Sequence, residues 1–169
     1  SSPAPTPVPV MSDDQTLETT YFSLSYPKVA TSSPMSESID FTSWSLRYMG
    51  AEQIKSGRTQ AELFDGYSVA ISAFPSVVGD DPRTTQAESD REGTINDCDD
   101  SSVTPIKSAN VAGNDAISFS GGCIGEATNY YIMNKDVLIR ITTMVVGSQE
   151  LTFDYQQAVD KIIASLKLL

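Results

Sequence analysis

The strongest constraint on the fold is a run of alternating apolar and polar residues over 128–146. Side chains of a β-strand alternate between its two faces, so this period predicts one strand over 128–133 and another over 137–146. Three polar residues separate them and predict a turn: Asn134, Lys135 and Asp136. The sequence therefore predicts an antiparallel hairpin.

The only charged residue in the second strand of this hairpin is Arg140. A guanidinium group on a central strand can bind the anionic group of a ligand. A guanidinium that emerges on the solvent face of the sheet is commoner, because charged side chains are rarely buried without a partner. We favour the solvent face and keep an anion site as the alternative.

Further strands are predicted wherever the same alternation is bounded by Gly or Pro. The stretch 51–64 follows neither the strand period nor the helix period, so it predicts neither element. The remaining strands are expected over 22–26, 41–48, 67–73, 104–111 and 116–120.

Two helices of opposite character are predicted. The C-terminal one has a cap at Thr152, an acid in its first turn at Asp154, and an apolar stripe that should pack on the sheet. The other begins with Asp81 as its cap and Pro82 at its first position. It is strongly polar and must lie largely in water. The stripe of the C-terminal helix is Tyr155, Val159, Ile162, Ile163 and Leu166, and the only core contacts expected of the polar helix are Ala87 and Ile95.

The polar helix and the residues after it carry eight acids and two bases between Asp80 and Asp100. Asn96, Asp97, Asp99 and Asp100 stand close together, which is a candidate calcium site. Calcium needs six to eight oxygens and usually a glycine that allows a sharp turn, and the adjacent sequence lacks that pattern. We favour a solvated acidic face, for which a basic partner protein is the natural ligand.

Composition excludes several functional classes. The net charge of −11, without any cluster of Lys or Arg, disfavours nucleic acids and anionic membrane surfaces as partners. The chain has no histidine, which removes Ser-His-Asp and Cys-His catalysis and histidine zinc sites. We predict no catalytic residues, no cofactor and no metal site.

The two cysteines, Cys98 and Cys123, are open to three interpretations: a disulfide, two buried free thiols, or a reactive thiol. We favour the disulfide, which would stabilise the fold by roughly 3 kcal/mol on the chain-entropy model. A disulfide implies an oxidising compartment outside the cytoplasm.

The first 20 residues differ in composition from the rest. Ser1 to Val10 has Pro at every second position from Pro3 to Pro9, which favours extended polyproline II structure. We expect a disordered leader over 1–20 and one domain over 21–169. The sequence contains no signal peptide, so either it begins after processing or the protein is cytosolic. A lipid anchor upstream of this sequence would suit a secreted or membrane-anchored lipoprotein.

Three short motifs in this order resemble the PsbP-like superfamily: Phe22 to Pro27, Val111 to Ala116, and Ile162 to Lys167. The resemblance implies an α+β fold, with an antiparallel β-sheet flanked by helices in an α/β/α sandwich. It also implies a scaffold whose members mostly bind other proteins. The cysteines and the acidic helix depart from that pattern, and no functional residue of the superfamily can be matched here.

Two functional hypotheses follow. The favoured one is a non-enzymatic extracytoplasmic binding or accessory protein of the cell envelope, a monomer whose partner is a protein or a surface polymer. The alternative is a carboxylate-based hydrolase, for which the candidate acids are Asp65, Glu126 and Asp136, or a domain that binds a small ligand or calcium.

Overall fold

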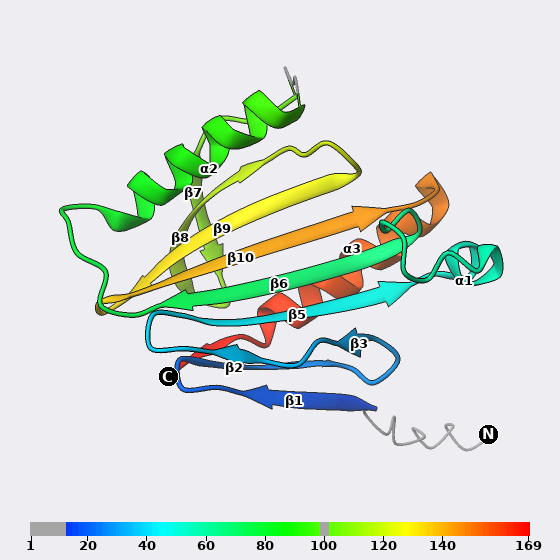
Figure 1. The fold of residues 1–169 in the computed structure, drawn as a ribbon, viewed down its shortest axis with the longest axis horizontal. Coiled ribbons are helices and arrows are strands. Elements are labelled where there is room, and N and C mark those ends of the chain that lie inside the picture. Colours follow the sequence, from blue (N-terminus) through cyan, green and yellow to red (C-terminus); the bar gives the residue numbers. More distant parts are fainter. Residues whose placement is uncertain (1–12, 99–101) are drawn as a thin grey trace, which may run out of the picture.

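A computed structural model describes residues 13–98 and 102–169 (Figure 1). Within these residues, the chain forms strands and helices that cover most of its length. The strands are β1 (Asp14–Glu18), β2 (Phe22–Pro27), β3 (Thr31–Ser32), β4 (Ser36–Glu37), β5 (Thr42–Met49), β6 (Gly66–Phe74), β7 (Lys107–Val111), β8 (Asn114–Ser120), β9 (Glu126–Asn134), β10 (Val137–Val146) and β11 (Lys167–Leu168). The helices are α1 (Ala51–Ser56), α2 (Pro82–Cys98) and α3 (Gln149–Ala164).

The main sheet is antiparallel and has the strand order β3-β5-β6-β10-β9-β8-β7, with β4 also paired to β5. The predicted β9–β10 hairpin is confirmed at its centre, with Ile141 opposite Tyr130 on one side and Ile71 of β6 on the other. The two strands are joined by the two-residue turn Lys135 and Asp136. The chain thus has the expected α+β architecture, an antiparallel sheet flanked by helices (Figure 1).

A second, three-stranded sheet has the order β1-β2-β11. Strand β1 pairs with β2 from Asp14 opposite Pro27 to Glu18 opposite Ser23. The expected disorder over 1–20 is therefore wrong for residues 14–18, which form an edge strand. These residues have little apolar surface, and the strand is held by backbone hydrogen bonds to β2, which leave no apolar pattern in the sequence. The Pro-rich part over 1–12 lies outside the described residues.

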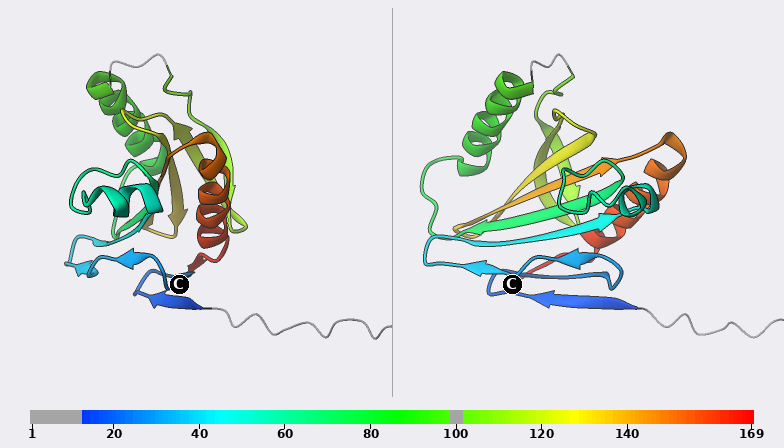
Figure 2. Two further views of the ribbon diagram at one scale, coloured as in Figure 1. Left: turned by 90° about the vertical axis from the view of Figure 1, so that its right-hand side faces the viewer. Right: turned by 45° about the vertical axis from the view of Figure 1, so that its right-hand side comes forward.

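The larger core lies on the face of the main sheet that α3 covers (Figure 2). The predicted stripe of α3 is confirmed, with Tyr155, Val159, Ile162 and Leu166 buried and Ile163 packed against their cluster. Strand β2 closes this core from the second sheet with Phe22, Leu24 and Tyr26. The helix begins at Gln149, three residues before the predicted cap at Thr152, and Ser148 stands at its N-cap.

The opposite face of the sheet carries a smaller core beneath α2. Ala87 is fully buried and Ile95 packs beside it, as predicted, on Phe119, Tyr131 and Leu138 of the sheet. Asp81 caps the helix as expected, because its carboxylate accepts the backbone N–H of Thr84 at 3.2 Å. So little apolar area leaves α2 dependent on other contacts.

Two segments of the chain differ from the sequence-based expectation. Residues 51–64, which predicted no element, begin with helix α1 and continue as a loop. The buried side chain of Gln53 holds that loop, because its Oε1 accepts the N–H groups of Phe64 and Asp65 and its Nε2 donates to the carbonyls of Arg58 and Glu62. Strand β7 begins at Lys107, three residues later than predicted.

Cys98 and Cys123 form the predicted disulfide, with 4.8 Å between their Cα atoms. It joins the last residue of α2 to the loop between β8 and β9, and so closes the end of the helix onto the sheet. Because α2 buries so few apolar side chains, the covalent bond supplies a large share of what keeps its C-terminal turns in place.

We predict that replacing both cysteines, Cys98→Ser with Cys123→Ser, lowers the free energy of unfolding by about 3 kcal/mol, the chain-entropy value for a loop of this length. Urea denaturation followed by circular dichroism measures the change. Wild-type protein unfolded in excess reductant is the control and should show the same loss. Equal stability of the oxidised wild type and the double variant would contradict a structural role for the bridge.

Candidate functional site

Asp65, the first of the three candidate acids, has a structural role. The residue as a whole is only 3% exposed. Oδ1 accepts a hydrogen bond from the hydroxyl of Tyr155 at 2.7 Å, and Oδ2 accepts the backbone N–H of Glu52 at 2.9 Å. The carboxylate therefore satisfies one of the free N–H groups in the first turn of α1 and fixes α3 to the sheet.

The structure does not bring the candidate acids together. Glu126 begins β9, whereas Asp136 lies in the turn just past the other end of that strand. Asp65 is buried under α3, and both Glu126 and Asp136 are exposed. A glycosidase needs two carboxyl groups within about 10 Å across one cleft. As a catalytic set, these three acids are a wrong prediction.

The candidate calcium site is only partly within the described residues. Asn96 and Asp97 lie exposed in the last turn of α2, and Asp99 and Asp100 lie outside the described residues. Over 13–98 and 102–169, no group of three or more Asp, Glu, His or Cys side chains is placed to hold a metal ion.

The favoured interpretation placed Arg140 free on the solvent face of the sheet. The structure instead pairs its guanidinium group with an acid of α2. Its Nη1 lies 3.2 Å from Oδ2 of Asp90 on α2, and the same oxygen accepts the hydroxyl of Tyr131 at 2.7 Å. Burial, followed by the hydrogen bond to Asp90, raises the pKa of Tyr131 well above its usual range. Arg140 thus attaches α2 to the sheet. The sequence could not show this, because Asp90 is 50 residues away.

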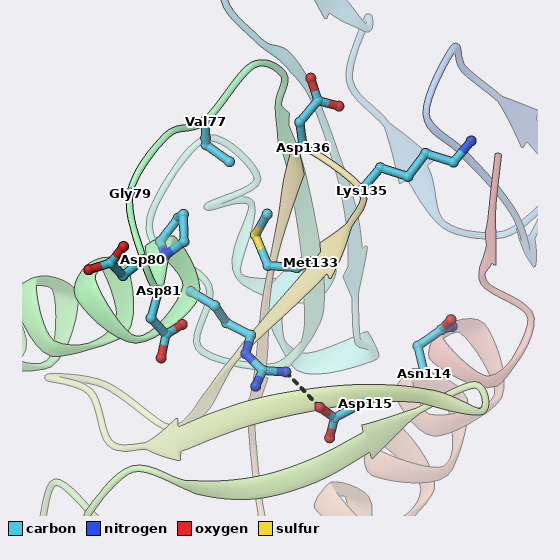
Figure 3. Close-up of a pocket in the computed structure, with 11 residues that line it drawn as sticks. Val77, Gly79, Asp80, Asp81, Asn114, Asp115, Met133, Lys135 and Asp136 are labelled. Atoms are coloured by element: carbon cyan, nitrogen blue, oxygen red, sulfur yellow. Dashed lines mark hydrogen bonds and ion pairs between the residues drawn. The ribbon is translucent and has the colours of Figure 1, made fainter.

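An open pocket lies at one end of the sheet (Figure 3). It has a volume of about 570 Å³. Its wall is formed by the loop from β6 to α2, the first turn of α2, the start of β8, and the end of β9 with the turn to β10. Its charged and amide lining residues are Asp80, Asp81, Arg83, Asn114, Asp115, Lys135 and Asp136. We call this the loop-end pocket.

Several charges of the loop-end pocket are already engaged. Nη1 of Arg83, in the first turn of α2, pairs with Oδ2 of Asp115 on β8 at 3.0 Å (dashed line in Figure 3). Hydrogen bonds from the hydroxyl and the amide of Thr84 lower the pKa of the Asp81 carboxyl. An acid with a lowered pKa stays ionised at neutral pH, so Asp81 suits a cationic ligand and not the role of a general acid.

Sequence reasoning missed the loop-end pocket. Asp136 was considered for catalysis and Asp81 for capping, but nothing in the chain joins the turns 112–113 and 135–136 until the strand register is known. The turn residues with positive φ, Ala112 and Lys135, are not residue types that signal such a conformation.

No protein-family model matches this chain, and no curated protein sequence is similar to it. Its structure is similar to that of cyanobacterial PsbP from Synechocystis sp. PCC 6803, with a TM-score of 0.56 at 15% identity, over 100% of this chain and 98% of that one. The chain has a PsbP-like fold. The same fold relates it to LpqN, a Mycobacterium tuberculosis protein involved in cell envelope biogenesis, with a TM-score of 0.51 at 10% identity over 92% and 90% of the two chains.

The resemblance inferred from the three short motifs is therefore confirmed at the level of the fold. The first two motifs form β2 and the β7–β8 turn, and the third forms the last turn of α3 and the start of β11. None of the described helices is long and apolar enough to span a membrane.

We predict that Tyr155→Phe lowers the free energy of unfolding by about 1–3 kcal/mol, because Asp65 Oδ1 loses its partner in a buried place. Tyr130→Phe is the matched control. Tyr130 packs against the larger core, which also contains Tyr155, and its hydroxyl bonds to no described residue. Urea denaturation of both variants gives the comparison. Equal losses would mean that the Asp65 bond contributes nothing of its own.

We also predict an alkaline loss of stability. Burial raises the pKa of Tyr67 to about 12, whereas a tyrosine in the unfolded chain titrates near 10. The unfolded chain therefore releases this proton first, so the contribution to stability is complete below pH 10 and falls as the pH rises towards 12. The slope approaches about 1.4 kcal/mol per pH unit for each such group.

Urea midpoints at pH 9, 10 and 11 test this effect. Tyr67→Phe keeps the ring and removes the proton, so its midpoint should fall less steeply with pH than that of the wild type. Parallel slopes for the two proteins would contradict the assignment.

Proposed function

We propose that this chain is a non-enzymatic extracytoplasmic accessory protein that binds a partner protein or surface polymer through its loop-end pocket. The observation that carries the proposal is the pocket itself, which is open and lined by exposed charges of both signs. It lies between turns that the sheet holds in place. Such a surface suits recognition of another large molecule.

The compartment is supported by two observations. Cys123 of the Cys98–Cys123 bridge is exposed. Exposed disulfides persist in compartments outside the cytoplasm, where glutathione does not reduce them. LpqN, which shares the PsbP-like fold, is described as taking part in cell envelope biogenesis. A secreted or lipid-anchored protein of the envelope agrees with both.

Carboxylate catalysis receives less support. Asp65, Glu126 and Asp136 lie apart. In the loop-end pocket, hydrogen bonds lower the pKa of Asp81, which is the opposite of what a general acid needs, and Asp115 is paired with Arg83. Binding uses the same side chains without that requirement, because ionised acids and bases both attract complementary charges.

Site-specific photocrosslinking tests the proposal. A photoreactive lysine analogue replaces Lys135 at the pocket, and in a matched control it replaces Lys55, which is exposed at the opposite end of the sheet. We expect crosslinks to a distinct envelope component from position 135, suppressed by excess unlabelled protein, and few from position 55. The same cell fractions report the redox state of Cys98 and Cys123.

Two results would contradict this function. Crosslinks that are equal from both positions and insensitive to competitor would exclude binding through the pocket. Free thiols together with recovery of the protein in the cytosol would exclude the compartment.

A further inference from the structure

The two most exposed large apolar side chains of the described residues lie at the same end of the sheet. Ile39 is 91% exposed and Val78 is 90% exposed. Ile39 lies in the turn before β5 and Val78 in the loop after β6, and these two strands are neighbours, with Thr42 opposite Ala73. Figure 1 shows both connections at the left end of the sheet, from where the loop after β6 rises to the first turn of α2.

An aromatic pair lies between these two positions. Phe41 follows Ile39 by two residues, and its ring centroid is 6.5 Å from that of Phe74, the last residue of β6. Phe74 and Val77 pack against the smaller core under α2. Apolar surface thus continues from that core to the tips of both loops. We call Ile39, Phe41, Phe74, Val77 and Val78 the apolar tip.

The loops that carry the apolar tip are held by hydrogen bonds. The N–H of Ser38 donates to the carbonyl of Phe41 at 2.8 Å, and the N–H of Val77 donates to the carbonyl of Asp136 at 3.0 Å. Ser76, just before Val77, has a φ of 59°, a left-handed conformation that costs free energy in a residue other than glycine. The chain therefore accepts strain in a turn that exposes an aliphatic side chain, an arrangement frequent at binding sites.

The surroundings of the apolar tip are acidic. Glu37 and Asp40 flank Ile39, Asp80 and Asp81 follow Val78, and Asp136 lies on the adjoining turn; all five are exposed. The nearby bases are Lys135 and Arg83, and Arg83 is already paired with Asp115. A binding surface complementary to the apolar tip therefore needs an apolar centre and a cationic rim. The same acids repel an anionic bilayer.

From these observations we infer that the apolar tip docks onto an apolar surface bordered by Lys and Arg side chains on a partner protein. The inference rests on the proposed binding function and names the chemistry of the partner. Ile39 and Val78 supply the buried contact area. Asp40, Asp80 and Asp136 supply attraction and orientation.

Defined peptides provide the probe. One is an amphipathic helix of Leu and Lys with a fluorescent label, and the other has the same Leu positions with Glu in place of Lys. We expect the Leu/Lys peptide to bind, as measured by fluorescence anisotropy, and the Leu/Glu peptide not to bind. Ile39→Ser with Val78→Ser should weaken binding of the Leu/Lys peptide at least tenfold. Asp40→Asn with Asp80→Asn and Asp136→Asn should weaken it and reduce its dependence on salt.

The opposite end of the sheet supplies matched controls. Ile54 and Phe153 are 60% and 66% exposed there. Ile54→Ser with Phe153→Ser controls for the loss of two apolar side chains. Glu52→Gln with Glu150→Gln and Asp154→Asn controls for the loss of three acids. We expect both controls to change binding less than twofold, and urea denaturation verifies that every variant is folded.

Three outcomes would overturn the inference: no binding of the Leu/Lys peptide, equal losses in the test and control variants, or tip-dependent binding to phosphatidylcholine vesicles in place of the peptide. The last would assign the apolar tip to a membrane. Competed crosslinks from position 135 combined with any of these results would leave the proposed binding function intact and refute only the partner chemistry. Absence of competed crosslinks would contradict the binding function itself.

Discussion

The buried carboxylate of Asp65 is the group through which helices α1 and α3 are fixed to the start of β6. It accepts a hydrogen bond from Tyr155 of α3 and another from the first turn of α1, and its own residue precedes β6. Helix α3, whose Tyr155 is 90 residues from Asp65, therefore meets α1 and β6 at one carboxyl group. A Cβ atom at Gly50 would collide with both Asp65 and Tyr155, so glycine at this position permits the approach.

The two faces of the main sheet carry unequal cores, and Asp65 anchors α3 over the larger one. With α3 fixed across β6 and β10, the larger core is completed by β2 and closed by aromatic contacts such as Tyr48 with Tyr67, whose ring centroids are 5.1 Å apart. The other face receives a helix that is polar nearly throughout. Helix α2 is fixed there by the disulfide, by Asp90 with its two partners, and by Arg91, whose Nε donates to the carbonyl of Thr104 at 2.7 Å.

Local periodicity predicted the elements whose burial is strong. Strands β6 and β10 and helix α3 could be recognised because each buries one regular face in the larger core. Strands β1, β3, β4 and β11 were missed, since they are short or exposed edge segments held by backbone hydrogen bonds that leave no apolar pattern. The roles of Asp65 and Arg140 were also beyond sequence reasoning, because Tyr155 and Asp90 are 90 and 50 residues away from them.

The polar attachment of α2 has a consequence for the surface. A helix held by an apolar stripe must turn a wide face inward, whereas a covalent bond and a few charged contacts leave most of its circumference in water. The acids of α2 that face away from the sheet therefore stay hydrated and take no position from an apolar contact. The first turn of α2 and the loop before it can then present Asp80, Asp81 and Val78 together, beside a pocket that the sheet turns complete. The acidic composition is therefore not only a property of one solvated helix, because part of it lines the loop-end pocket and surrounds the apolar tip, through which we propose that the protein binds its partner.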